Sequence, residues 1–222
     1  TERFFRFSTR KFQLPKNLPR TLTTAEIRQL ISVADAQVYQ PQSSFHKILN
    51  IRNSVILELL FCLGLRIGEI SALNLAHYDS EDRTLLIHGK GRKERLLYIS
   101  SPEVLQKLNN WLDIRNELHP VTDAIFLNRY GGRLSIYGIE NLFQKYRDLS
   151  SINPNSTPHY LRHSFATQLL NNGASIRDVQ ELLGHASIVT TQIYTEVSID
   201  RRRQVLERYN ARNFLFDCRE LK

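Results

Sequence analysis

Residues 51–70 read Ile-Arg-Asn-Ser-Val-Ile-Leu-Glu-Leu-Leu-Phe-Cys-Leu-Gly-Leu-Arg-Ile-Gly-Glu-Ile. Apolar side chains recur with helical spacing from Ile51 to Leu63, and Gly64 is a stop signal that precedes a second, short predicted helix. Arg66 stands at the start of that helix among apolar neighbours. It is either an exposed arginine on a solvated face or a core-adjacent charge, which needs a partner. Glu69, three residues on, can hold it in place.

The segments on either side of this stretch predict a mainly α protein with a small antiparallel β-sheet (α+β) and a single domain. Two capping boxes and two Ser/Thr-Pro pairs mark helix starts, namely Thr23 with Glu26, Ser175 with Asp178, Ser101-Pro102 and Thr157-Pro158. Residues 84–88 and 95–99 flank a Gly-Lys-Gly-Arg turn, which is a good hairpin signal. Residues 39–46 read as a loop, and Ser187 and Ser198 are expected to cap two further helices.

Composition excludes several classes of protein. The chain has 222 residues and two cysteines, Cys62 and Cys218, which cannot form a disulfide framework and favour a reducing, cytoplasmic location. The longest apolar run, from Val55 to Leu65, is too short and interrupted to span a bilayer, so no membrane partner is expected. The chain starts at Thr1 and contains no Met, so we expect a fragment of a longer protein.

The charge distribution indicates a polyanionic partner. The formal net charge is +8. Basic residues gather in residues 1–20, 89–95 and 201–212. Three separate basic clusters favour the phosphate backbone of a nucleic acid over a small acidic substrate.

The glycine-flanked hairpin tip carries a candidate functional lysine. Lys90 is either an ordinary solvated turn residue or a lysine delivered into a groove by the hairpin. In the second case Arg92, Lys93 and Arg95 are expected to contact phosphates.

Histidines and a tyrosine complete the candidate chemistry. His159 and Arg162 share the first turn of a predicted helix, with His163 beside them, and helix amino ends attract phosphate. His185 precedes Tyr194 by nine residues, and a His close to a Tyr in a basic protein suggests a phenol that attacks phosphorus. Each residue alone is as readily a capping, surface or buried side chain.

Together these segments resemble the tyrosine recombinase (phage integrase) family, in its Xer-like branch. The resemblance rests on GLRIGE around Arg66, GKGRKER around Lys90, HYLRHSFAT around His159 and Arg162, LLGH at His185, and TTQIY ending at Tyr194. It covers about residues 21–205, in the family's order and spacing.

The resemblance implies a catalytic set and a mechanism. Tyr194 would attack the scissile phosphate and form a 3′-phosphotyrosyl link, while Arg66 and Arg162 grip the non-bridging oxygens and His185 donates a further hydrogen bond. Lys90 would be the general acid, His159 would assist proton transfer at the tyrosine, and Glu69 would orient the site. His163 is expected to contact DNA. No metal, ATP or other cofactor is implied, and the sequence has no P-loop or zinc motif.

The resemblance also implies partners and domain limits. We expect a site-specific recombinase or integrase of bacterial, phage or mobile-element origin. It would act as a homo-tetramer on double-stranded DNA, with accessory proteins in some systems. Residues 1–20 are expected to be a basic linker from an amino-terminal DNA-binding domain, and residues 21–205 the catalytic domain.

Two alternatives stay open at this point. A type IB topoisomerase uses similar chemistry to relax supercoils, although the spacing from LLGH to the tyrosine favours a recombinase. A catalytically silent DNA-binding relative is the other, although an intact catalytic set argues against it.

Residues 206–222 are expected to be a carboxy-terminal tail. Phe214, Leu215, Phe216 and Leu221 are large apolar residues in a terminal segment, where polar residues are usual. They either fold back on their own domain or dock into a neighbouring protomer as a subunit-exchange segment.

Overall fold

The computed structural model describes residues 20–40, 43–89, 94–184 and 196–216, and for residues 196–201 it describes the backbone only. Within these ranges the helices are α1 (Thr24–Tyr39), α2 (Ser44–Cys62), α3 (Ile67–Ala72), α4 (Pro102–Ile114), α5 (Ile136–Leu149), α6 (Pro158–Asn171), α7 (Ile176–Leu183) and α8 (Glu196–Tyr209). Short 3-10 helices are η1 (Leu75–His77), η2 (Arg115–Leu118) and η3 (Ala211–Asn213), and the strands are β1 (Tyr78–Asp79), β2 (Thr84–His88) and β3 (Glu94–Tyr98). The predicted fold class, mainly helical with a small antiparallel sheet, is confirmed.

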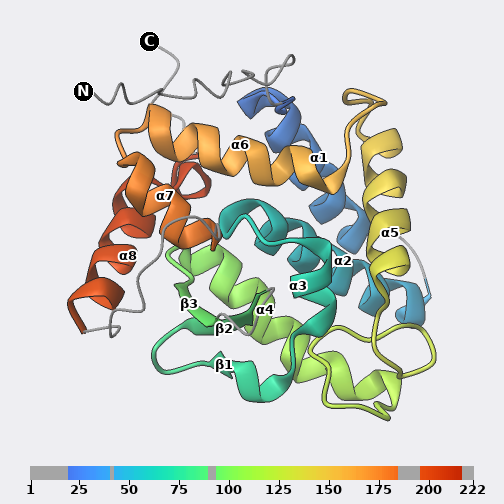
Figure 1. The fold of residues 1–222 in the computed structure, drawn as a ribbon. Coiled ribbons are helices and arrows are strands. Elements are labelled where there is room, and N and C mark those ends of the chain that lie inside the picture. The colour runs from blue at the N-terminus through green and yellow to red at the C-terminus, as the bar shows by residue number, and fades with distance from the viewer. Residues whose placement is uncertain (1–19, 41–42, 90–93, 185–195, 217–222) are drawn as a thin grey trace, which may run out of the picture.

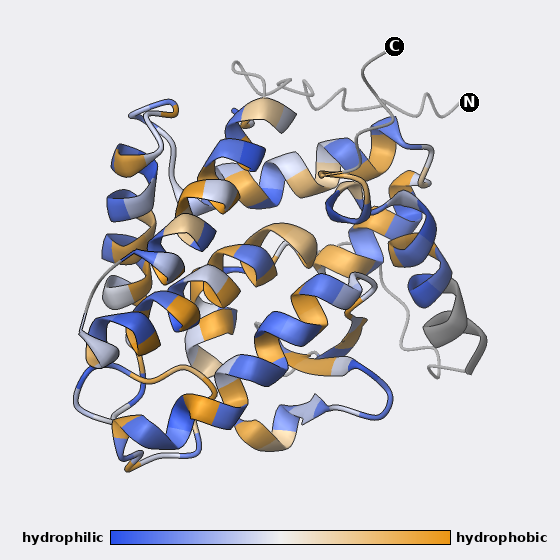
Figure 2. Cartoon of the chain, turned by 180° about the vertical axis from the view of Figure 1, so that it is seen from behind, coloured by the Kyte–Doolittle hydropathy of each residue, from blue (hydrophilic) through white to orange (hydrophobic). Residues whose placement is uncertain are grey.

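Helix α2 forms the centre of the fold. It contacts α1, α3, α4, α5 and α6, and every residue from Arg52 to Cys62 is buried. Figure 1 shows α2 enclosed by these helices, and in Figure 2 the helices around it are banded with hydrophilic and hydrophobic residues. The sequence predicts helically spaced apolar residues in α2. From Arg52 to Cys62 the helix is buried on every side, because neighbouring elements cover each of its faces.

The sheet lies at one end of the helices. Its strand order is β1-β2-β3, with antiparallel pairing throughout. The hairpin of β2 and β3 is as predicted, whereas β1 has only two residues and carries no signal of its own. In the register of the hairpin Ile87 lies opposite Arg95, on a face that also buries Leu85 and Leu97. Strand β3 therefore turns one charged side chain toward the interior.

Local capping signals are confirmed at most helix starts. Thr23 with Glu26 and Ser175 with Asp178 form the predicted capping boxes, and Pro102 and Pro158 occupy first turns. Two predicted limits are wrong: α2 already begins at Ser44, inside the predicted loop, and α8 begins at Glu196, before Ser198. The helix predicted to be capped by Ser187 lies outside the described residues.

Gly64 makes the turn from α2 into α3. It has a φ of 58°, in the left-handed region that glycine adopts without strain. A Cβ atom at this position would lie 2.4 Å from Cδ1 of Phe165 on α6. The absence of a side chain therefore lets α6 approach the start of α3 closely.

The carboxy-terminal segment packs against its own domain as far as it is described. Helix α8 continues through the predicted boundary at residue 206. Leu215 is 2% exposed, and its carbonyl accepts a hydrogen bond from Nε of Arg28 at 2.7 Å. Phe214 and Phe216 remain partly exposed, and residues 217–222 lie outside the described residues. The described part of the predicted tail therefore packs against its own domain through Leu215, which is one of the two outcomes that the sequence left open.

None of the helices in the described part of the chain is both long and apolar enough to cross a membrane.

Candidate catalytic site around Glu69

The carboxylate of Glu69 is the centre of the candidate site. It accepts a hydrogen bond from the backbone N–H of Arg66 at 2.9 Å and another from Nη1 of the same residue at 2.9 Å. The contact predicted between these two residues is therefore present. Glu69 is buried, whereas the side chain of Arg66 is 39% exposed. The guanidinium of Arg66 is thus held by Glu69 through Nη1, while part of the side chain faces solvent.

A second arginine, Arg95, binds the same carboxylate from β3. Its Nη1 and Nη2 donate to the two oxygens of Glu69 at 2.9 and 2.8 Å, a bidentate geometry. Its Nε donates to the carbonyl of Leu182 at 2.8 Å. Arg95 is only 6% exposed. This geometry does not favour the sequence-based prediction that Arg95 contacts DNA phosphate, because its Nε and both Nη atoms already donate to protein acceptors.

Arg162 reaches the site from the first turns of α6. It donates through Nη1 to the carbonyl of Gly64 and through Nη2 to the carbonyl of Leu183 at 2.6 Å. Its Nη1 also lies 3.8 Å from an oxygen of Glu69. One planar side chain thus ties α6 to the turn before α3 and to the last residue of α7, a task that suits the fixed fork of arginine.

The four side chains form a positively charged cluster. Three guanidinium groups surround one carboxylate, which leaves two positive charges in excess. Burial raises the pKa of Glu69, but hydrogen bonds and charge from Arg95, with further contributions from Arg66 and Arg162, hold that pKa below its ordinary value. Burial and the charge of Arg66 lower the pKa of Arg162 to about 10, against the attraction of Glu69. Arg162 is therefore still protonated at neutral pH, and the cluster suits an anionic ligand.

Two histidines lie on α6 beside Arg162. His159 and His163 are both exposed, one turn apart at the amino end of the helix. Partial desolvation by the protein, together with the charges of His159 and Arg162, lowers the pKa of His163. Both rings can therefore reach a ligand at this helix end, and His163 favours its neutral form there.

Five predicted site residues, Lys90, Arg92, Lys93, His185 and Tyr194, lie outside the described residues. For two of them the preceding residue is described: Lys90 follows Gly89, just after β2, and His185 follows Gly184, the residue that ends α7. Arg95 and Arg162 hold the two adjacent carbonyls of Leu182 and Leu183 at that helix end.

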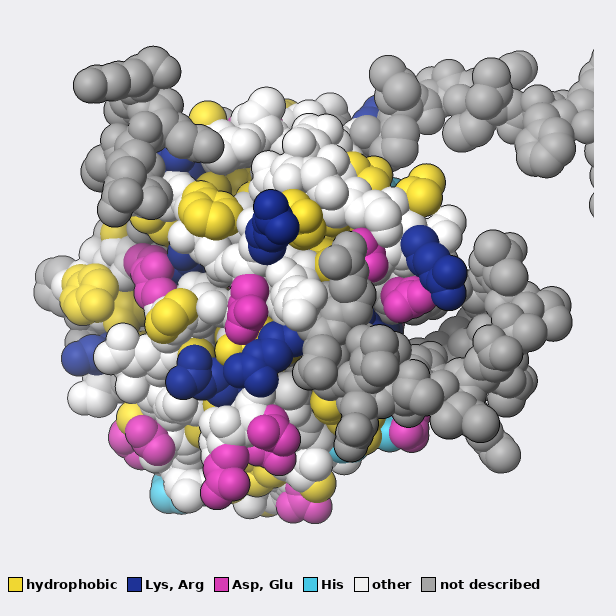
Figure 3. Space-filling model, turned by 90° about the vertical axis from the view of Figure 1, so that its left-hand side faces the viewer, with side chains coloured by type: hydrophobic (Ala, Val, Ile, Leu, Met, Phe, Trp, Pro, Cys, Tyr) yellow, Lys and Arg dark blue, Asp and Glu magenta, His cyan; other side chains and the backbone are white. Residues whose placement is uncertain are grey.

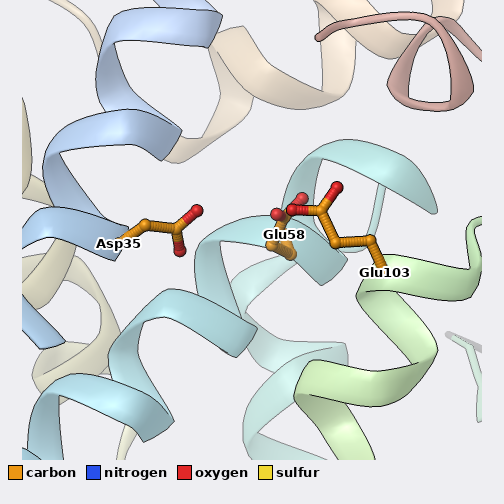
Figure 4. Close-up of side chains that lie close together, drawn as sticks. All are labelled: Asp35, Glu58 and Glu103. Atoms are coloured by element: carbon orange, nitrogen blue, oxygen red, sulfur yellow. The ribbon is translucent and has the colours of Figure 1, made fainter.

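A group of acidic side chains elsewhere has the composition of a metal site, but its carboxylates are already paired with cationic side chains. Asp35, Glu58 and Glu103 point toward one another from α1, α2 and α4 (Figure 4). Lys107 lies 2.7 Å from oxygens of both Asp35 and Glu58, and Arg212 binds Glu58 and Glu103. The carboxylates thus have protein cations as partners, and the group is a structural network.

Sequence reasoning missed the role of Arg95, although a signal was present. Arg95 lies two and four residues before Leu97 and Ile99 in the predicted strand. Because side chains two residues apart share a face of a strand, Arg95 is expected on the same buried face as these two residues. A charge on a buried face predicts an internal partner.

In a comparison with protein families, the phage integrase family matches residues 20–201, which is most of the chain. A tyrosine recombinase XerC from Actinobacillus pleuropneumoniae is 36% identical over 197 residues, 89% of this chain and 61% of that protein. A tyrosine recombinase XerD from Mycobacterium leprae is 41% identical over 197 residues, 86% of this chain and 60% of that protein.

Solved structures show the same fold. The XerA recombinase has a TM-score of 0.66 at 27% identity, over 85% of this chain and 65% of that one. The XerH site-specific recombinase bound to its difH substrate has a TM-score of 0.67 at 26% identity, over 80% of this chain and 50% of that one.

The match has a defined extent. The chain spans about 60% of the length of the curated relatives it matches. Within that span the sequence segments, the fold and the family match all agree. The chain therefore belongs to the phage integrase family, among whose members are the tyrosine recombinases named XerC and XerD.

Proposed function

We propose that the chain is the catalytic part of a site-specific DNA recombinase that cuts and rejoins DNA through a 3′-phosphotyrosyl intermediate. The observation that carries this proposal is the cluster of Arg66, Arg95 and Arg162 around the buried carboxylate of Glu69. The cluster has excess positive charge, and Arg66 keeps part of its guanidinium exposed. A phosphodiester in transfer gains negative charge on its non-bridging oxygens, and preorganised donors stabilise that charge.

In this proposal Tyr194 is the nucleophile. Its oxygen forms a bond to phosphorus as the bond from phosphorus to the 5′-oxygen breaks. His159 assists removal of the phenol proton, and Lys90 donates a proton to the departing 5′-oxygen. Arg66, Arg162 and His185 stabilise the non-bridging oxygens. The phosphotyrosine ester conserves the energy of the broken bond, so rejoining needs neither ATP nor a metal.

The proposed partner is double-stranded DNA carrying a specific recombination site. The related XerH recombinase was solved bound to its difH substrate. The net charge of +8 favours such a partner. We further propose a homo-tetramer on paired sites, assisted by accessory proteins in some systems, in the cytoplasm of a bacterial host. His163, Arg92 and Lys93 are proposed DNA contacts.

Covalent trapping tests the activity and identifies the recombination site in the same experiment. The protein is incubated with a pool of nicked duplexes that have a randomised centre, so that cleavage releases a short strand and the reaction cannot reverse. Denaturant-resistant adducts are isolated and their DNA sequenced. We expect adducts with a shared sequence, and none from the Tyr194→Phe variant, which should still bind DNA.

Other outcomes would redirect the proposal. Adducts from the Tyr194→Phe variant would make Tyr209 the candidate nucleophile. Adducts without sequence preference, together with relaxation of supercoiled plasmid and no exchange between paired sites, would indicate a topoisomerase. Tight binding with no adduct would indicate a silent DNA-binding relative.

A further inference from the structure

Arg95 joins three parts of the candidate site. It lies on β3, the strand that begins four residues after Lys90 in the sequence. Its guanidinium binds both oxygens of Glu69 on α3 and, through Nε, the carbonyl of Leu182 on α7. Three elements distant in sequence are thus linked by one planar group.

Each of these links leads to a proposed catalytic residue. Glu69 holds Arg66 through its backbone and its side chain. Leu182 lies three residues before His185, at the end of α7. Strand β3 itself begins four residues after Lys90. Arg95 therefore contacts the supports of three proposed catalytic residues.

The packing at the end of α7 fits Arg95 closely. Gly184 ends that helix with a φ of 64°, and a Cβ atom there would lie 3.2 Å from Nη1 of Arg95. The neighbouring carbonyl of Leu183 is held by Arg162. Two guanidinium groups thus fix consecutive carbonyls, which restricts both the position and the rotation of the helix end before His185.

We propose that Arg95 is a positioning residue for the reaction, which fixes the supports of Arg66, Lys90 and His185 relative to one another before DNA binds. The inference rests on the proposed function for the identity of those residues. Arg95 touches neither DNA nor the reacting atoms, because its guanidinium is buried on Glu69. A lysine could not replace it, since one ammonium lacks the fork that meets a carboxylate and a carbonyl together.

The electrostatics of Glu69 give the proposal a distinctive signature. Burial raises the pKa of that carboxyl, and Arg95 is the strongest opposing influence, ahead of Arg66 and Arg162. Without Arg95 the pKa of Glu69 rises. Glu69 then gains a proton at a higher pH and releases Arg66, so the acid limb of the cleavage profile moves to higher pH.

The test compares Arg95→Met and Arg95→Lys with the matched control Arg115→Met. Arg115 is equally buried, at 4% exposure, and donates to the carbonyls of Ala124 and Thr122, away from the site. Measurements are the single-turnover cleavage rate at saturating DNA, the affinity for DNA, and cleavage from acid to neutral pH. The DNA is a nicked duplex carrying the sequence recovered by trapping.

We expect both Arg95 variants to cleave on the order of 100-fold more slowly, the loss that a displacement of about 1 Å can cause. Their affinity for DNA should stay within about twofold, and their acid limb should move to higher pH. Arg115→Met should change thermal stability without moving the pH profile. Unchanged cleavage and pH profile in folded Arg95 variants would overturn the proposal. So would a loss of affinity accompanied by a smaller salt dependence, which would make Arg95 a phosphate contact.

A measurement without DNA keeps the two proposals separate. Amide hydrogen exchange at Leu183 and Gly184, the end of α7, should become at least about tenfold faster in Arg95→Met and stay unchanged in Arg115→Met. If the wild-type protein forms no adduct but exchange behaves this way, Arg95 still fixes the end of α7, and it is the proposed recombinase activity that fails. Equal exchange in all three proteins would overturn the positioning role whatever the activity.

Discussion

At the scale of single residues, the site separates two kinds of arginine by exposure. Arg66 is 39% exposed, whereas Arg95 and Arg162 are buried and donate to protein acceptors. Each of the three carries a guanidinium, but only an exposed guanidinium can reach a ligand without a rearrangement. Arg66 is therefore the described arginine of this cluster best placed to meet a phosphate first.

A prediction at this scale distinguishes the roles of Lys90 and Arg66. A Lys90→Ala variant should cleave slowly on normal DNA but recover on a substrate with a 5′-bridging phosphorothioate, because a thiolate leaves without protonation. Arg66→Ala should not recover, since it stabilises the non-bridging oxygens. Cleavage rates on both substrates measure this, and a Lys90→Ala variant that the sulfur substrate fails to rescue would not have lost a general acid.

At the scale of elements, the carboxy-terminal segment is attached to the centre of the fold by charge. Arg212, just after α8, donates to both oxygens of Glu58 on α2 and to Glu103 on α4. Lys107 binds Glu58 as well. Burial raises the pKa of Glu58, but the hydrogen bonds and charges of Arg212 and Lys107 bring it below its ordinary value. The segment that follows α8 is thus fixed to the central helix by a fully buried carboxylate.

This attachment predicts a defined dependence of stability on pH. Because the pKa of Glu58 is lower in the folded protein than in the unfolded chain, its contribution is complete above the ordinary value of 4.5. The contribution is lost as pH falls below that value. The Glu58→Gln variant should be less stable at neutral pH by about 3–5 kcal/mol, the cost of leaving buried cations without their charged partner. Its stability should also fall less on acidification.

Denaturant unfolding from pH 3 to pH 7 (about the range where carboxylates titrate) measures both effects. Glu103→Gln is the matched control, because Glu103 binds the same Arg212 but is 51% exposed. It should cost less than about 1 kcal/mol. Equal losses for the two variants would contradict the claim that burial makes Glu58 the anchor.

At the scale of the whole molecule, the net charge is +8, and the positively charged side chains are distributed unevenly. Figure 3 shows the side on which α7 and α8 lie, where on the described part of the surface Lys and Arg are interspersed with Asp and Glu. That part of the face has mixed charge. The excess positive charge in the described site instead lies around Glu69.

Binding of the whole chain to DNA should therefore depend steeply on salt. If about six phosphates are contacted, raising salt from about 50 to 200 mM should weaken binding by on the order of 1,000-fold. Titration of a labelled duplex at several salt concentrations measures the slope. An affinity that is indifferent to salt would contradict a phosphate-dominated interface.

The sequence by itself determined the contacts that join residues only a few positions apart. Thr23 with Glu26, Ser175 with Asp178, and the hairpin of β2 and β3 were predictable, because capping and hairpin bonds join residues a few positions apart. The contact of Glu69 with Arg66 belongs to this class, since one helical turn brings the two side chains together.

Tertiary structure alone decided the long-range pairs. Arg95 lies 26 positions from Glu69, Arg162 lies 98 positions from Gly64, and Arg212 lies 154 positions from Glu58. No local period specifies such partners, because they follow from which helices pack on α2 and how closely. The same packing buries α2 on every side from Arg52 to Cys62 and draws Leu215 into the core, whereas the sequence left the tail free either to fold back or to dock on a neighbour. Burial makes each of these pairs important for the stability of the fold, since a charge removed from water is stable only beside its partner.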